Sequence, residues 1–148
     1  MEKKIKLARY RKYPYIVNCP KTNRSYKWAG SMGNKIDIKE VSQETFDWLF
    51  METNCFPLGS LVIVDKKADE EFKNSLLEEE YQAIKNNTNT AQEIAGILTG
   101  NTNTMKAELR KITSKEEKSF VIEVAREIGL DSVTKINFLN EWVGAEVL

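Results

Sequence analysis

The sequence has no histidine and only two cysteines in 148 residues. Without histidine, the usual general base and every Ser–His or Cys–His catalytic pair are missing. Cys19 and Cys55 fall short of the four Cys or His ligands of a structural zinc, so one zinc per chain is excluded unless two chains share it. We therefore expect no metal site, no cofactor and no catalytic residue. The sequence predicts a protein that binds partners and is not an enzyme.

Long apolar runs are also missing. No stretch approaches the roughly 18 consecutive apolar residues of a membrane span, and lysines and arginines interrupt the start of the chain, unlike in a cleaved signal peptide. We expect a protein that is kept in the cytoplasm, or in an assembly built there, with no membrane partner. A reducing cytoplasm favours two buried thiols at Cys19 and Cys55, although the sequence leaves a disulfide between them open.

Two further kinds of site have little support. Neither GxGxxG nor GxxxxGK[ST] occurs, so the sequence has no phosphate-binding loop, and we expect no small-molecule substrate. The acidic runs 69–71 and 78–80 suggest a divalent cation, but consecutive residues of a helix point in different directions and do not converge on one ion. We interpret these acids as a solvated helix face.

Charge is segregated along the chain, although the formal net charge is zero. Residues 1–40 hold eleven basic and three acidic residues, 41–100 hold four and eleven, and 101–148 hold seven and eight. This asymmetry indicates an acidic or nucleic-acid partner for the N-terminal part, or head-to-tail self-association. The alternative is that the basic and acidic blocks neutralise each other within one fold.

The first 65 residues predict a small β-rich unit. The runs 13–19, 25–28 and 35–39, separated by turn residues, predict a three-stranded antiparallel meander, and Ile5, Leu7 and Tyr10 hint at an earlier strand. Ser42 is a good N-cap for a short helix that crosses the sheet. The apolar run 61–64 fits a buried central strand.

The remainder predicts helices, so the fold class is α+β: a small antiparallel β unit with one crossing helix (1–65), an acidic helix and linker (66–89), and a C-terminal bundle of four short α-helices (90–148). We place the acidic helix at 69–85 and interpret 86–90 as a linker or a tight cap. Thr90 with Glu93, and Ser114 with Glu117, are capping boxes that start two helices of the bundle. Asn103 or Thr104 starts another, and Ser132 or Asp131 caps the last.

A basic N-terminal segment is the first candidate binding site. Its cations are interleaved with tyrosines, which suits an acidic protein groove or a nucleic-acid backbone with stacked bases. The cations are Lys3, Lys4, Lys6, Arg9, Arg11 and Lys12. The alternative is an ordinary edge strand, protected by its lysines against unwanted pairing.

The second candidate is the helix pair at 91–112. A helix through Glu93 and Ile94 ends at Gly100, and the next contains Met105-Lys106-Ala107-Glu108-Leu109 and then Ile112. This segment resembles the helix-extension-helix pattern of the SAP and related DNA-binding families, with a shorter connection between the helices. The resemblance implies that Lys106, Arg110 and Lys111 contact phosphates.

The chain as a whole resembles the small structural or assembly proteins of tailed bacteriophages. It is rich in lysine and asparagine, and it joins a small β unit to a capped helical bundle without an enzyme signature. The resemblance implies contacts with a capsid, neck or tail protein through exposed strands and arms. We expect the partner to be a larger protein assembly, such as a virion, or a second copy of the chain. A nucleic-acid-binding protein is the alternative.

Overall fold

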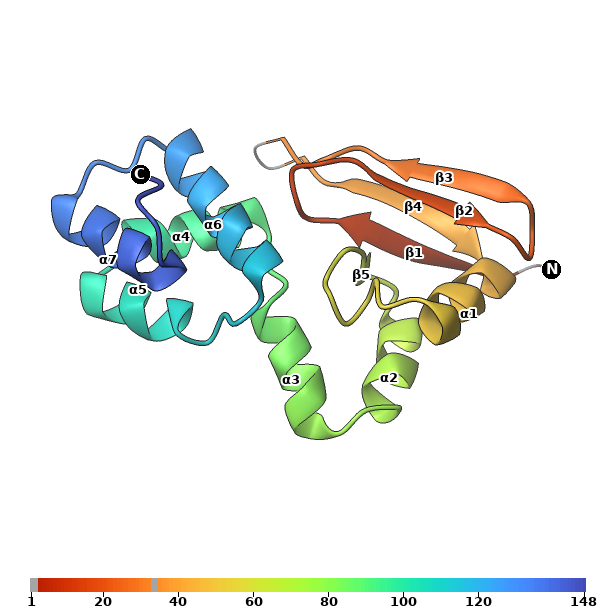
Figure 1. The fold of residues 1–148 in the computed structure, drawn as a ribbon. Coiled ribbons are helices and arrows are strands. Elements are labelled where there is room, and N and C mark those ends of the chain that lie inside the picture. The colour runs from red at the N-terminus through yellow and green to blue at the C-terminus, as the bar shows by residue number, and fades with distance from the viewer. Residues whose placement is uncertain (1–2, 33–34) are drawn as a thin grey trace.

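The computed structural model describes residues 3–32 and 35–148 (Figure 1). Its β-rich part contains β1 (Lys4–Arg9), β2 (Tyr15–Cys19), β3 (Arg24–Trp28), β4 (Asp37–Ser42), α1 (Gln43–Glu52) and β5 (Val62–Ile63). Its helical part contains α2 (Lys66–Asn74), α3 (Glu78–Asn86), α4 (Ala91–Thr99), α5 (Thr102–Leu109), α6 (Lys115–Glu127) and α7 (Val133–Val143). The predicted α+β class is confirmed. We call β1–β5 with α1 the β unit, and α4–α7 the bundle.

The predicted meander is wrong, because the strands form two separate sheets. β2 and β3 pair as the expected hairpin, whereas β4 pairs with β1, in the order β4-β1-β5. The chain crosses between the sheets near Gly30, where a Cβ atom would lie 1.4 Å from the carbonyl oxygen of Lys12. Only glycine allows this approach. The chain later enters β4, which pairs with β1 and also contacts β3.

The basic segment is neither a free arm nor an edge strand. β1 is the middle strand of its sheet and pairs with β4 from Lys4↔Ser42 to Arg9↔Asp37. Ile5 and Leu7 point into the core and are fully buried. The alternation of lysines with apolar residues in this segment therefore reflects a two-faced central strand.

The run 61–64 contributes an edge strand and not the predicted central one. Only Val62 and Ile63 pair, and they pair with β1 alone. Leu61, Val62 and Ile63 are nevertheless buried, because α2 packs against β5 and covers this edge. A continuous apolar run therefore marks burial on both faces, whatever the position of the strand in the sheet.

Helix boundaries follow the capping residues closely. Ser42 and Thr90 cap α1 and α4, and Glu93 completes the capping box at Thr90. The four helices predicted after Thr90 are present, although α5 is capped by Asn101, ahead of the predicted start. The single acidic helix predicted at 69–85 is two helices, α2 and α3, separated by the turn 75–77.

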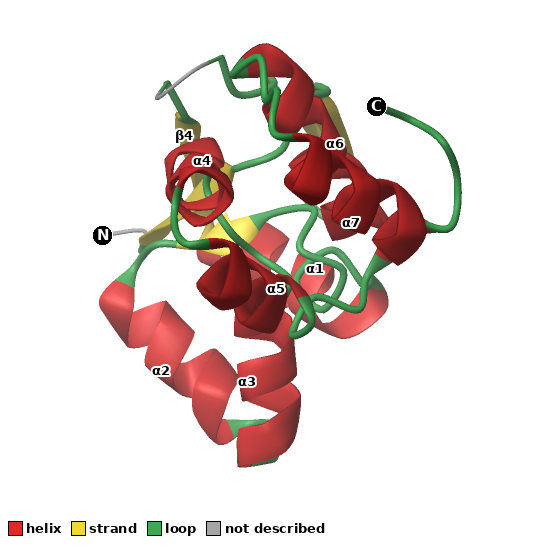
Figure 2. Cartoon of the chain, turned by 90° about the vertical axis from the view of Figure 1, so that its left-hand side faces the viewer, coloured by secondary structure: helices red, strands yellow, loops and turns green. Residues whose placement is uncertain are grey.

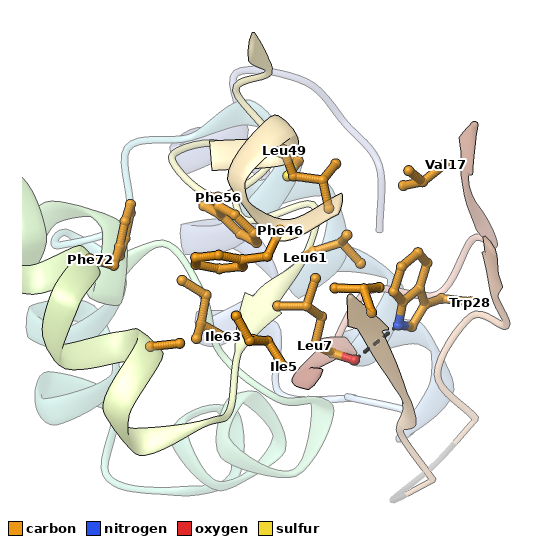
Figure 3. Packing of buried hydrophobic residues seen from close by; sticks show 13 residues of the cluster. Ile5, Leu7, Val17, Trp28, Phe46, Leu49, Phe56, Leu61, Ile63 and Phe72 are labelled. Atoms are coloured by element: carbon orange, nitrogen blue, oxygen red, sulfur yellow. Dashed lines mark hydrogen bonds between the residues drawn. The ribbon is translucent and has the colours of Figure 1, made fainter. Parts of the chain in front are cut away.

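Two hydrophobic clusters stabilise the fold. The first joins both sheets, α1 and α2 through residues from Ile5 to Phe72, with Leu76, Tyr81 and Ile84 packed against it (Figure 3). The second fills the bundle, where α4–α7 lie together (Figure 2). Among the described residues, no helix is both long and apolar enough to cross a membrane.

Trp28 joins the two sheets of the β unit. Its side chain is fully buried, and its Nε1 donates a hydrogen bond of 2.9 Å to the carbonyl oxygen of Leu7 in β1 (Figure 3). We expect Trp28→Phe to lower the free energy of unfolding by about 1–3 kcal/mol, because it removes this hydrogen bond and leaves a void. Urea denaturation followed by circular dichroism measures the loss. Trp48→Phe in α1, at a half-buried position, is the matched control, and an equal loss in both variants would contradict the assignment.

Candidate interaction surfaces

The structure divides the six predicted N-terminal cations into two groups. Lys3, Lys4 and Lys6 are exposed on and beside β1. Arg9 and Arg11 are buried, and half-buried Lys12 forms an ion pair of 2.8 Å with Glu127 of α6. The six residues are therefore not one binding surface, and of these six only the first three are exposed, with Lys6 directly opposite exposed Glu40 of β4.

Arg11 connects three parts of the molecule. Its Nη1 donates to the carbonyl oxygen of Leu58 at 2.8 Å, and its Nη2 donates to that of Asn87 at 3.2 Å. Nε and Nη2 each lie 3.4 Å from Oε1 of Glu117 in α6. Gly59 makes room for this arrangement, because a Cβ atom there would lie 2.9 Å from Nη2. Arg11 thus joins the β unit to the end of α3 and to the bundle.

Both carboxylate oxygens of Glu117 accept hydrogen bonds. Its second oxygen, Oε2, accepts hydrogen bonds from the backbone nitrogen of Asn89 at 2.8 Å and from its side-chain amide at 2.9 Å. The capping box predicted for Ser114 and Glu117 is therefore only half formed: Ser114 accepts from the Glu117 amide, but the carboxylate turns toward Arg11. Burial raises the pKa of Glu117 to about 6, and Asn89 and Arg11 oppose that rise.

Asn87 fixes the connection between α3 and α6. Its side-chain oxygen accepts hydrogen bonds from the backbone nitrogens of Thr113 and Ser114, both at 2.8 Å. Its side-chain nitrogen donates to the carbonyl oxygen of Ala83, also at 2.8 Å. Of the two interpretations of residues 86–90, the tight cap fits these bonds. We call Arg11, Asn87, Asn89 and Glu117 the polar lock.

Arg9 organises loops of the β unit. It donates to the carbonyl oxygens of Tyr13 at 2.9 Å and Ser60 at 2.8 Å, and its guanidinium lies 5.3 Å from the centre of the Tyr15 ring. Burial, with a smaller contribution from Arg11, lowers the pKa of Arg9. These contacts give the side chain a structural role.

A cleft of about 320 Å³ lies between the β unit and α6. It brings together Arg9, Arg11 and Lys12 of the predicted site. The facing wall of α6 carries Glu116 and Glu123, so the two walls carry opposite charges. This distribution does not favour a uniformly anionic ligand such as a nucleic-acid backbone.

The hairpin β2–β3 carries a basic surface that sequence reasoning missed. Ile16 lies opposite Lys27, and Asn18 lies opposite Ser25, all with exposed side chains. Lys21 in the turn and Arg24 add two exposed cations. The signal was present in the sequence, because residues 13–28 contain three basic residues and no acid. Arg24 is paired with buried Cys19, so it projects from the other side of the hairpin. We call Ile16, Lys21 and Lys27 the basic hairpin face.

The three cations predicted to contact phosphates lie close together on and after α5. Lys106 and Arg110 lie 5.5 and 6.0 Å from the centre of the Phe138 ring, and Lys111 forms an ion pair of 3.2 Å with Glu108. Arg110 and Lys111 are exposed. Each of the three therefore already has an intramolecular partner, which leaves its role in nucleic-acid binding a prediction.

The basic and acidic blocks do not neutralise each other by direct contact. In residues 3–32 and 35–148, the ion pairs from the basic block to later residues are Arg11–Glu117 and Lys12–Glu127, and both reach α6. Within these ranges no ion pair joins the basic block to α2 or α3, and no carboxylate lies within 4.0 Å of the Lys3, Lys4, Lys6 or hairpin cations. Outward-facing charge is thus left unpaired in both blocks.

The remaining candidate chemistry is sparse. Cys19 and Cys55 are both free and buried, and burial raises the pKa of the Cys55 thiol to about 11. The described part of the chain contains no group of three or more Asp, Glu or Cys side chains that could hold a metal ion.

Comparison with known families identifies the chain. Residues 3–79 match the family described as the YonA N-terminal domain, and residues 90–147 match the YonA C-terminal domain. The first match covers more than half of the chain, which therefore belongs to the YonA family. YonA is a phage-type protein name, consistent with a phage origin. No curated protein and no solved structure matches the chain.

The polar lock predicts a pH dependence of stability. The ordinary pKa of a Glu side chain is 4.5, and that of folded Glu117 is about 6. Between pH 4.5 and about pH 6, Glu117 therefore holds a proton in the folded chain that the unfolded chain has released. The free energy of unfolding therefore falls by about 2 kcal/mol as pH rises through this window. Glu117→Gln has no carboxyl group to titrate at this position. The free energy of unfolding of the wild type, measured by urea denaturation relative to that of the variant, should therefore fall by that amount from pH 4.5 to pH 7. Glu123→Gln on the same helix is the control, and a difference independent of pH for Glu117→Gln would contradict the prediction.

Proposed function

We propose that this chain is a non-enzymatic interaction protein, a structural or assembly component that docks on a larger complex such as a phage virion through the outward-facing cations of its β unit. It acts in the cytoplasm and stays with the particle after assembly. It needs no cofactor, small-molecule substrate or membrane for this role.

The observation that carries the proposal is that some of the N-terminal cations bind other groups of the same chain, whereas others are exposed. Arg9, Arg11 and Lys12 have internal partners, while Lys3, Lys4 and Lys6 face solvent without a carboxylate within 4.0 Å among the described residues. Unpaired cations on a rigid strand attract an acidic partner and steer its approach.

The polar lock supports the same role. It joins the β unit to the bundle through buried hydrogen bonds, so both halves meet a partner as a prearranged surface. A surface that is already ordered loses less conformational entropy on binding.

The proposal predicts that the chain co-purifies with particles of a phage that encodes it. We expect Lys4→Glu with Lys6→Glu to reduce its content in gradient-purified particles by about tenfold or more, because both changes replace attraction by like-charge repulsion. Quantitative mass spectrometry of the particles measures the content.

Lys66→Glu with Lys67→Glu, at exposed positions of α2, is the control with the same change of charge. Circular dichroism shows whether each variant folds. Absence of the wild-type chain from particles and from their assembly intermediates would overturn the docking role.

Nucleic-acid binding is a second candidate, supported by one observation. Lys106 and Arg110 flank the same Phe138 ring, and Lys111 follows directly, so three cations lie within a small area of the bundle. Such a cluster suits contacts to consecutive phosphates.

This candidate predicts salt-dependent binding to short fluorescent single- and double-stranded DNA. Changing Lys106, Arg110 and Lys111 to alanine should reduce the slope of log K against log salt by about one unit for each phosphate that the variant no longer neutralises. Fluorescence anisotropy across a salt series measures the slope. Lys66→Ala with Lys67→Ala is the control, and an unchanged slope in the triple variant would remove the α5 cluster from consideration.

A further inference from the structure

We propose that the chain self-associates head to tail, with the basic hairpin face of one copy receiving the acidic tip of the α2–α3 pair of a second copy. The acidic tip comprises Leu77, Glu78, Glu79 and Glu80. The inference rests on the proposed function, since it names a second copy as one partner in assembly.

The basic hairpin face has the composition of a docking surface. Ile16 is 59% exposed and lies directly opposite exposed Lys27, and exposed Lys21 lies in the turn of the same hairpin. No acid occurs from residue 13 to residue 28 to compensate the three cations. An exposed β-branched side chain among unpaired cations fits an apolar group surrounded by carboxylates.

The acidic tip has the complementary composition. Leu77 is 65% exposed at the turn between the helices, and Glu78, Glu79 and Glu80 follow it with exposed side chains. Residues 69–80 contain six acids and one lysine. Leu77 occupies the N-cap position of α3 and provides no side-chain hydrogen bond, so the first amide groups of this helix rely on water or a partner.

The two surfaces cannot satisfy each other within one chain. In Figure 1 the hairpin lies at the upper right of the molecule, and the turn between α2 and α3 lies at the bottom. Among the described residues, no ion pair joins the two surfaces. Complementary charges at opposite ends can meet only between copies.

Contact between two different surfaces of the same chain is heterologous. Each copy then retains one free hairpin face or one free tip, so association continues until a ring closes or a filament grows. The formal net charge of zero removes the overall repulsion that would oppose this stacking. Exposed ion pairs are weak and screened, so the association should be salt-sensitive.

Sedimentation velocity of the purified full chain tests this contact. We expect the mean mass to rise with protein concentration at about 0.05 M salt, and the monomer to return at about 0.5 M salt, where the screening length is much shorter. A monomer at every concentration in low salt would overturn the inference. It would leave particle association, and with it the proposed function, intact.

Two charge reversals identify the surfaces. Lys21→Glu with Lys27→Glu reverses the charge of the basic hairpin face, and Glu79→Lys with Glu80→Lys reverses the charge of the acidic tip. Each variant should be monomeric alone. Mixed together, they should associate again, because the intact tip of the first meets the intact hairpin of the second, and the reversed hairpin and the reversed tip also carry opposite charges.

Arg110→Glu with Lys111→Glu in the bundle is the matched control, and it should associate like the wild type. Circular dichroism checks the fold of each variant. Persistent association of either reversal variant alone, or a mixture that stays monomeric, would overturn the head-to-tail contact.

Discussion

A buried ion pair holds the two halves of this molecule together. Arg11 and Glu117 lie at the junction of the β unit and the bundle, and each makes further hydrogen bonds beyond the ion pair. Such a pair does not stabilise a fold merely by its charge, because both groups lose their hydration when they are buried. Its contribution here is geometric: Leu58, the end of α3 and the start of α6 must all reach the same guanidinium and carboxylate. Asn87 completes the junction by binding the backbone ahead of α6.

The N-terminal cations differ according to whether they lie at this junction. Those taken into it, or into the loops around it, have protein partners and fixed positions. Those outside it, including Lys4 and Lys6 on β1 and Lys27 on β3, face solvent from a rigid β framework. The excess of basic residues near the N-terminus therefore includes both buried and exposed cations, and only the exposed cations are available to a partner. The acidic helices α2 and α3 pack on the first hydrophobic cluster through Phe72 and Tyr81, which leaves their glutamates exposed as well.

Local features of the fold could be predicted from the sequence, and long-range features could not. Ser42 and Thr90 mark helix starts because capping acts within three residues, and the α+β class follows from the change in apolar periodicity along the chain. Strand partners depend on which faces are covered in three dimensions, so the pairing of β4 with β1 had no local signal. Glu117 shows most directly that a local sequence pattern does not reveal a long-range contact. Its spacing from Ser114 fits a capping box, yet the carboxylate binds Arg11, which is 106 positions away. For the candidate site, the exposed lysines were predicted, whereas the burial of Arg9 and Arg11 and the hairpin surface required the structure.

The separation between Arg11 and Glu117 also has a consequence for synthesis on the ribosome. At roughly 5–20 residues per second, the β unit leaves the ribosome several seconds or more before α6 does. During that interval Arg11 has no carboxylate partner from the bundle, and the surface that will face α6 is open to solvent. The charge of Arg11 therefore stays hydrated until α6 has been synthesised. Packing of α6 against the β unit then removes water from around Arg11 and Glu117, which are both buried in the complete fold.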